Sequence, residues 1–207
     1  MTYATRLALF GIGLALALLL AAGLLAASLL GYIGGSTTVH PNSNFSVARA
    51  REFEEFSVFY AGEEVNGYPL TAVNHSPLGP MRKNAWSVDF TYGTCDVGPG
   101  FDPGGCSMPV EISNEPACSR NLAMYGGPLS PGAHPKRFRG ATAAFFERGS
   151  RIEIQTGTTT IVIFAFSKRE ALAVARSLRG VNTAVETGEA LPPPAAGALQ
   201  GKVPCPR

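Results

Sequence analysis

The stretch that decides the fold is RIEIQTGTTTIVIFAFSKREALAVARSLRG, residues 151–180. Its first six residues alternate apolar and polar side chains through Ile152 and Ile154, which is the period of a strand with one buried face. After a turn at Gly157, the segment from Ile161 to Phe166 is apolar on both faces, as expected of a central strand that is covered on both sides. These residues therefore predict a hairpin at the centre of a sheet.

The second half of the same stretch predicts a helix over residues 168–179. Ala171, Leu172, Ala175 and Leu178 recur at helical spacing, so the helix has an apolar face that can cover the sheet. Ser167 and Glu170 form a capping box at its start, and Gly180 is expected in the left-handed conformation at its end.

Shorter patterns on the N-terminal side extend the sheet. WSVDFTY, residues 86–92, alternates through Val88 and Phe90 and is the clearest further strand. A helix capped by Ser46 is expected over 47–56, and Asn66 and Gly67 mark a turn between two strands. The remaining predicted elements are strands at 57–62, 68–73, 109–113 and 139–148, with a helical turn at 118–125. The fold class is therefore α+β, with a mostly antiparallel sheet packed by one or two helices.

The N-terminus is dominated by an uncharged apolar run of about 27 residues, Leu7 through Ile33. This length suits an uncleaved transmembrane signal anchor better than a cleaved signal peptide, whose apolar region is about 7–15 residues. A small-residue cleavage site near Ala26–Ser28 is the alternative that stays open. Arg6 is the one charge before the run and favours a cytoplasmic N-terminus, so the rest of the chain is expected outside the plasma membrane.

The anchor defines the expected organisation of the whole chain. Residues 1–6 are expected in the cytoplasm, 7–33 in the membrane and 34–45 in a small, polar linker. A single extracytoplasmic domain follows over 46–190, and a Pro-rich tail occupies 191–207.

The cysteine count agrees with export. Cys95, Cys106, Cys118 and Cys205 all follow the apolar run, and an even number in an oxidising compartment predicts two disulfides. Cys95 and Cys106 flank a Gly- and Pro-rich loop, so we expect them to pair with each other. Cys118 would then pair with Cys205 and pin the tail. Zinc is the weaker alternative because the chain has no CxxC and its histidines are isolated from the cysteines.

Charge excludes one class of partner. The formal net charge is +2 and charged residues make up 15% of the chain, without the concentrated positive charge that a phosphate backbone requires. Nucleic-acid binding is therefore not expected. The oligomeric state is left open by the sequence.

The candidate catalytic groups of the sequence also have simpler structural roles. His75, Ser76 and either Asp89 or Asp96 form a triad only on paper, because neighbouring side chains of an extended segment point to opposite faces. Glu111 and Glu153 lie on predicted strands and form a glycosidase pair only if they face each other; solvent-facing strand positions are the simpler interpretation. The sequence therefore predicts no catalytic residue.

Candidate binding groups give the same result. Gly98 and Gly100 approximate a dinucleotide loop, but position 103 is proline, and Asp96 with Asp102 offers calcium too few oxygens. The sequence predicts no cofactor and no metal ligand. HPKRFR, residues 134–139, is either a solvated loop or a contact for an anionic polymer or lipid surface.

Two segments carry a resemblance to other proteins. IQTGTTTIVIFAFSKREALAVARSLRGVN and YAGEEVNGYPLTAV resemble parts of uncharacterised membrane-anchored or exported proteins of high-GC bacteria. The resemblance covers about a third of the chain and implies an envelope location, but it implies no activity.

Together these patterns predict a single-pass, membrane-anchored extracytoplasmic protein. Its domain is expected to be a structural or interaction domain of the cell envelope, binding an envelope protein or polymer. The alternative is a small cell-envelope hydrolase whose active site is dispersed over the strands.

Overall fold

The structure, a computed structural model, describes residues 37–78, 85–97, 106–119 and 135–205. The chain divides into two compact units, Met1–Thr38 with Asp96–Gly105, and Val39–Cys95 with Cys106–Arg207. The described residues of the smaller unit belong to strands β1 (Thr37–Val39) and β6 (Cys95–Val97), which pair in a two-stranded sheet. The expected membrane anchor at 7–33 lies outside the described residues. Within the described ranges, no helix is both long and apolar enough to span a bilayer.

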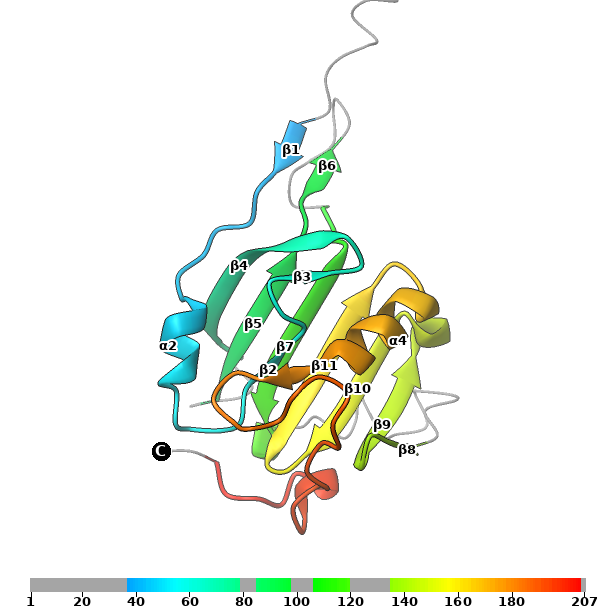
Figure 1. Ribbon diagram of the computed structural model, residues 1–207. Coiled ribbons are helices and arrows are strands. Elements are labelled where there is room, and N and C mark those ends of the chain that lie inside the picture. The colour runs from blue at the N-terminus through cyan, green and yellow to red at the C-terminus, as the bar shows by residue number, and fades with distance from the viewer. Residues whose placement is uncertain (1–36, 79–84, 98–105, 120–134, 206–207) are drawn as a thin grey trace, which may run out of the picture. The chain divides into compact units, whose positions relative to one another are not determined.

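The larger unit is built on an eight-stranded antiparallel sheet (Figure 1). Two meanders form it, and their last strands, β7 and β11, pair at the centre. In spatial order the strands are β3 (Glu64–Val65), β4 (Tyr68–Pro77), β5 (Trp86–Tyr92), β7 (Val110–Pro116), β11 (Thr159–Ala165), β10 (Arg151–Thr156), β9 (Ala141–Phe146) and β8 (Lys136–Phe138). The predicted central hairpin is therefore confirmed as β10 and β11, with β11 in the interior of the sheet.

Two tight turns help to set the strand register. Asn66 and Gly67 join β3 to β4 with φ of 54° and 82°, and Arg139 and Gly140 join β8 to β9 with φ of 48° and 89°. Two consecutive positive φ values are typical of the hairpin turns whose twist matches that of the strands they connect. Arginine is an unusual residue at such a position, because its Cβ makes the left-handed conformation costly.

The core lies on one face of the sheet. Side chains from the central strands are fully buried there, including Phe90, Ile112, Ile154, Ile161 and Ile163. Helix α4 (Lys168–Ser177) covers this face over β10 and β11, and α2 (Val47–Arg51) lies beside β4 (Figure 1). A short pair, β2 (Phe59–Tyr60) with β12 (Arg179–Gly180), completes the cover. The side chain of Asn114 on β7 holds β2 by bonding both the N–H and the carbonyl of Phe59, at 2.9 Å each.

Helix α4 begins as the sequence predicts. Ser167 is the N-cap and accepts a hydrogen bond from the Glu170 N–H at 3.2 Å, while its hydroxyl donates to the Glu170 carboxylate at 2.7 Å. The buried face differs by one residue from the prediction: Val174 is fully buried, whereas Leu172 is only partly buried.

The predicted C-cap of this helix is wrong. The helix ends at Ser177, Leu178 leaves it in an extended conformation, and Gly180 continues into β12 with no positive φ. The chain is drawn into this path by pairing with β2. Glycine is required at position 180 for space, because a Cβ there would stand 2.1 Å from the carbonyl oxygen of Thr183.

The first predicted helix is also too long. It ends at Arg51 instead of residue 56, and the strand expected over 57–62 is reduced to Phe59–Tyr60. The Asn182 side chain donates to the carbonyls of Phe53 and Phe56, at 2.6 and 2.8 Å, and thereby fixes a non-helical path. This contact bridges more than 120 positions in sequence, so local periodicity could not reveal it.

The four cysteines pair as predicted, Cys95 with Cys106 and Cys118 with Cys205. The tail is more than a segment pinned by its last cysteine. Leu191 is 1% exposed, Thr156 donates to the Pro192 carbonyl at 2.8 Å, and the Gly157 N–H donates to Pro193. Residues 191–195 therefore dock on the end of the β10–β11 hairpin by their own contacts.

Candidate functional site

The strands present a second, more polar face on the side of the sheet opposite α4. In β5 this face carries Ser87, Asp89 and Thr91, the positions that alternate with the buried Val88 and Phe90. The register carries the same face across the sheet, since Asp89 lies opposite Ser113 on β7 and Ser113 lies opposite Val162 on β11. Polar residues thus gather over β5 and β7 because the alternating patterns of these two strands are in phase, whereas β11 contributes the apolar Val162 and Phe164 to the same face.

A hollow of about 320 Å³ opens on this face. Its walls come from β5, β7 and β11, and they combine three carboxylates, three hydroxyls and one aromatic ring. The lining residues are Ser87, Asp89, Thr91, Glu111, Ile112, Ser113, Glu115, Val162 and Phe164. Pockets of this size, with a few placed polar groups and an apolar wall, are typical of small-ligand or polymer-subunit sites.

Asp89 is held in the hollow by two hydrogen bonds. Its two carboxylate oxygens accept hydrogen bonds from the hydroxyls of Ser113, at 2.5 Å, and Ser87, at 2.8 Å. Burial raises the pKa of Asp89 above its ordinary value, although both serine hydrogen bonds act in the opposite direction. The carboxyl group is therefore oriented before any ligand arrives.

Glu111 is the second carboxyl group of the hollow. It lies opposite Thr91, so it is a diagonal neighbour of Asp89 across the β5–β7 pair, where Cβ atoms are typically about 7–8 Å apart. Desolvation, and then the negative charge of Asp89, raise the pKa of Glu111. The charge of Asp89 thus disfavours the ionisation of a second carboxyl group in the same wall.

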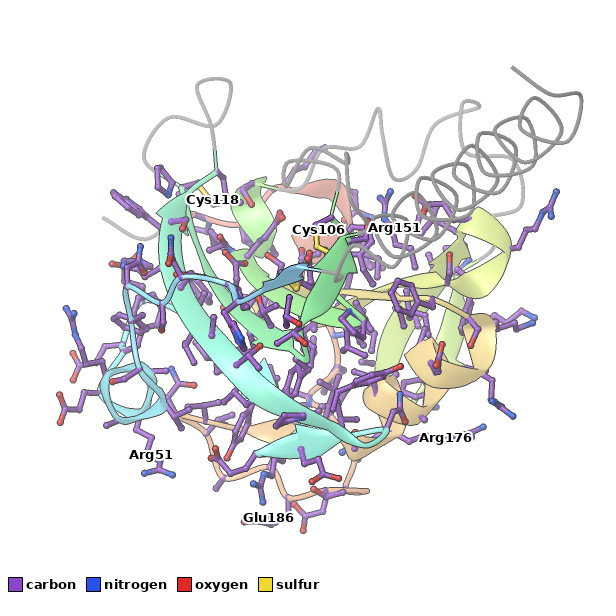
Figure 2. The ribbon with its side chains drawn as sticks, turned by 90° about the horizontal axis from the view of Figure 1, so that it is seen from above. Arg51, Cys106, Cys118, Arg151, Arg176 and Glu186 are labelled. Carbon is purple, nitrogen blue, oxygen red and sulfur yellow. A yellow bond between two sulfur atoms is a disulfide. The ribbon has the colours of Figure 1, made fainter. Side chains whose placement is uncertain are left out.

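The aromatic ring of Phe164 forms part of the other wall, and the guanidinium of Arg151 lies beside this ring. Phe164 on β11 lies opposite both Glu111 and Arg151, and its side chain remains 38% exposed. The Arg151 guanidinium carbon lies 5.6 Å from the Phe164 ring centroid and 4.8 Å from that of Phe146. Figure 2 shows Arg151 on the side of the sheet away from the α4 residue Arg176. The hollow therefore offers a flat apolar surface next to its acceptors.

The structure does not bring Glu111 and Glu153, the candidate glycosidase pair, together. Glu111 and Glu153 share this face, but β11 lies between their strands, and Glu153 is level with Ser113 and Val162. Glu153 is 1% exposed and accepts a hydrogen bond from Gln155 at 2.9 Å, so the expectation that it faces solvent is wrong. Its carboxylate belongs to a buried polar row with Gln155 and Thr160.

The residues of the candidate triad do not form one site either. His75 lies opposite Val88 on the core face, among the rings of Phe45, Phe53 and Trp86, at centroid distances of 4.9–5.4 Å. Ser76 alternates to the other face, where Asn74 lies opposite Asp89. The alternation of β4 therefore places the His75 and Ser76 side chains on opposite faces of the sheet, although the interaction with His75 still acts to lower the pKa of Asp89.

The other sequence candidates have different outcomes. Residues 98–105, with Gly98, Gly100 and Asp102, and the Asp96 side chain lie outside what the structure describes. Lys136 and Arg137 are exposed on the edge strand β8, whereas the Arg139 side chain turns into the domain. In the described part of the chain, no group of three His, Cys, Asp or Glu side chains is placed to hold a metal ion.

The sequence did not predict that Asp89 and Glu111 are diagonal neighbours on adjacent strands. Both residues stand at the polar positions of alternating segments, so each segment alone predicted a solvent-facing acid. Their proximity depends on β5 and β7 being neighbours in the register that aligns Asp89 with Ser113. A sequence signal existed in the alternating polar residues at 87–91 and 111–115, but it did not specify the strand order.

Comparisons with known protein families, with curated proteins and with solved structures gave no match.

Proposed function

We propose that this chain is a single-pass membrane-anchored extracytoplasmic protein, and that its domain binds a hydroxyl-rich polysaccharide of the cell envelope at the hollow. The apolar run at 7–33 supports the anchor, and the two disulfides support an oxidising compartment. The high-GC bacterial resemblance of the sequence supports the same location.

The observation that carries the binding proposal is the composition of the hollow. The hydroxyls of Ser87 and Ser113 already donate to Asp89, so they are not free donors for a ligand, whereas the ionised carboxylates of Asp89 and Glu111 can accept further hydrogen bonds. Sugar hydroxyls supply the matching donors. The exposed ring of Phe164 provides a flat surface for the C–H face of a sugar ring.

Co-sedimentation of the detergent-solubilised full chain with purified, insoluble peptidoglycan tests this proposal. We expect Phe164→Ala and Glu111→Gln to lower the bound fraction at least about tenfold, the effect of losing about 1.4 kcal/mol. Phe166→Ala is the matched control, because Phe166 is 61% exposed and does not line the hollow. Equal binding by all three variants would contradict the proposal.

A second candidate is a small envelope hydrolase. It is favoured by one observation, the diagonal pair of Asp89 and Glu111, both with a raised pKa, since paired carboxyl groups are the catalytic groups of most glycosidases. Release of new reducing ends from the same peptidoglycan would identify this activity. A hydrolase predicts that Glu111→Gln abolishes release, whereas a binding domain predicts no release by the unmodified chain.

A further inference from the structure

The charges of the larger unit are unevenly distributed along the sheet. In the β3-to-β7 half with α2, the described residues include two cations, Arg49 and Arg51, and eight acids: Glu52, Glu54, Glu55, Glu63, Glu64, Asp89, Glu111 and Glu115. The sequence adds Arg82 and Lys83 between β4 and β5, outside the described residues. Residues 135–181 of the other half contain three acids, Glu147, Glu153 and Glu170. The same residues contain nine cations: Lys136, Arg137, Arg139, Arg148, Arg151, Lys168, Arg169, Arg176 and Arg179.

Several of these cations form one exposed surface. Ala171, Val174 and Ala175 turn the inner side of α4 to the core, so Arg169 and Arg176, seven residues apart, project together from the outer side. Figure 2 shows Arg176 extending from α4 away from the ribbon. None of Arg148, Lys168, Arg169 and Arg176 forms an ion pair within 4.0 Å with any described residue.

The surface continues past the start of the helix. The stem of Lys168 lies over Gly149, where an added Cβ would stand 2.6 Å from Lys168 Cγ, and Gly149 follows the exposed Arg148. Phe166 precedes the N-cap Ser167 and is 61% exposed, more than Phe164 or Trp86. We call Arg148, Phe166, Lys168, Arg169 and Arg176 the basic surface.

We propose that the basic surface docks on anionic lipid headgroups, with the Phe166 ring at the interface. This inference rests on the proposed membrane anchor, which would hold the domain close to the bilayer. Lys and Arg near an anionic leaflet are attracted to it, and an aromatic ring is favoured at the level of the headgroups. An anionic polymer would engage the cations but would leave Phe166 in water, so the exposed ring favours a lipid surface.

Fluorescence quenching by brominated lipids tests the docking. Trp86 is the one tryptophan of the chain, so the double variant Trp86→Phe, Phe166→Trp reports from the basic surface alone. The full-length variant is reconstituted into nanodiscs of brominated phosphatidylglycerol and phosphatidylcholine, or of brominated phosphatidylcholine alone. We expect at least twofold stronger quenching in the anionic discs, reversed by 0.5 M salt and by adding Arg169→Glu and Arg176→Glu.

The unmodified chain, with Trp86 as its reporter, is the matched control and should be quenched equally in both lipids. A reporter at position 166 that stays unquenched in chains retained by the discs would overturn the docking. Chains that elute without the discs would instead contradict the anchor. A shift of the emission of the residue 166 reporter by soluble polyphosphate, without lipid quenching, would assign the surface to an anionic polymer and also overturn the proposal.

Discussion

At the scale of single residues, the Arg139 side chain connects the turn after β8 to the end of α4 and to the loop that follows it. Its guanidinium donates to the carbonyls of Ala175, Arg176 and Leu178 at the end of α4, at 2.8–3.2 Å, and to Glu186 and Glu189 in the following loop. These carbonyls have no partners within the helix, and their dipoles favour a cation. This set of contacts offsets the cost of placing an arginine at a positive-φ turn position.

We therefore predict that Arg139→Ala lowers the free energy of unfolding by about 2–4 kcal/mol, because the half-buried carbonyls of Ala175 and Leu178 lose their donor. Arg139→Lys should restore less than half of the loss, since an ammonium group cannot reach the same set of acceptors. The exposed neighbour Arg137→Ala is the control and should change stability by less than about 0.5 kcal/mol. Chemical denaturation measures all three, and equal effects at positions 137 and 139 would exclude this role.

Asp89 gives a prediction about pH. Burial raises its pKa in the folded state, so folding favours the protonated carboxyl, and this contribution to stability is present at low pH and is lost as pH rises through the raised pKa. The unfolding midpoint of the unmodified chain should therefore fall relative to that of Asp89→Asn between pH 4 and pH 7. Ser113→Ala removes a hydrogen bond that lowers the pKa, so it should move the transition to higher pH. Parallel pH profiles for the unmodified chain and Asp89→Asn would contradict the burial argument.

At the scale of elements, α4 owes its place to its apolar face. Leu178 is fully buried, so Leu178→Asp places an unpaired charge in the core and should cost several kcal/mol, about 3–5. Val174→Asp should cost as much, whereas Leu172→Asp should cost less because Leu172 is only partly buried. Arg176→Ala is the exposed control on the same helix. Thermal or chemical unfolding of the four variants should rank them in this order, and a Leu172 effect equal to that of Val174 would mean that the helix is rotated.

The C-terminal tail is held both by the Cys118–Cys205 disulfide and by the contacts of residues 191–193 with the sheet. Removal of one disulfide by Cys118→Ser with Cys205→Ser should release only the residues beyond Ala198, because Leu191, Pro192 and Pro193 keep their contacts with the sheet. Limited proteolysis with a protease of broad specificity should then cut within residues 199–205 and spare the bonds around Leu191. Trypsin is unsuitable because the sequence has no Lys or Arg between Arg179 and Lys202. Adding Leu191→Ala should expose the whole tail to protease. Cleavage near residue 191 in the double cysteine variant alone would show that the disulfide is the main restraint.

At the scale of the whole molecule, strongly periodic segments predicted structure well. The alternation in 86–92 and 151–156, the two-faced strand and the capped helix follow from local spacing, and each is present in the structure. The errors lie where a distant side chain overrides local preference, as Asn182 does at Phe53 and Phe56, and as β2 does at Gly180. The hollow could not be predicted for the same reason, since it arises from the register of β5, β7 and β11.

The most direct test of the binding proposal is site-specific photocrosslinking in intact cells. A benzoylphenylalanine residue replaces Phe164 in the hollow or, as a control, the exposed Glu54 beside α2. After irradiation, the full chain is purified and its covalently attached material is digested and analysed for sugars. We predict attached cell-wall saccharide at position 164 and none at position 54. Saccharide attached equally at both positions, or absent from position 164, would contradict the claim that the hollow is the binding site.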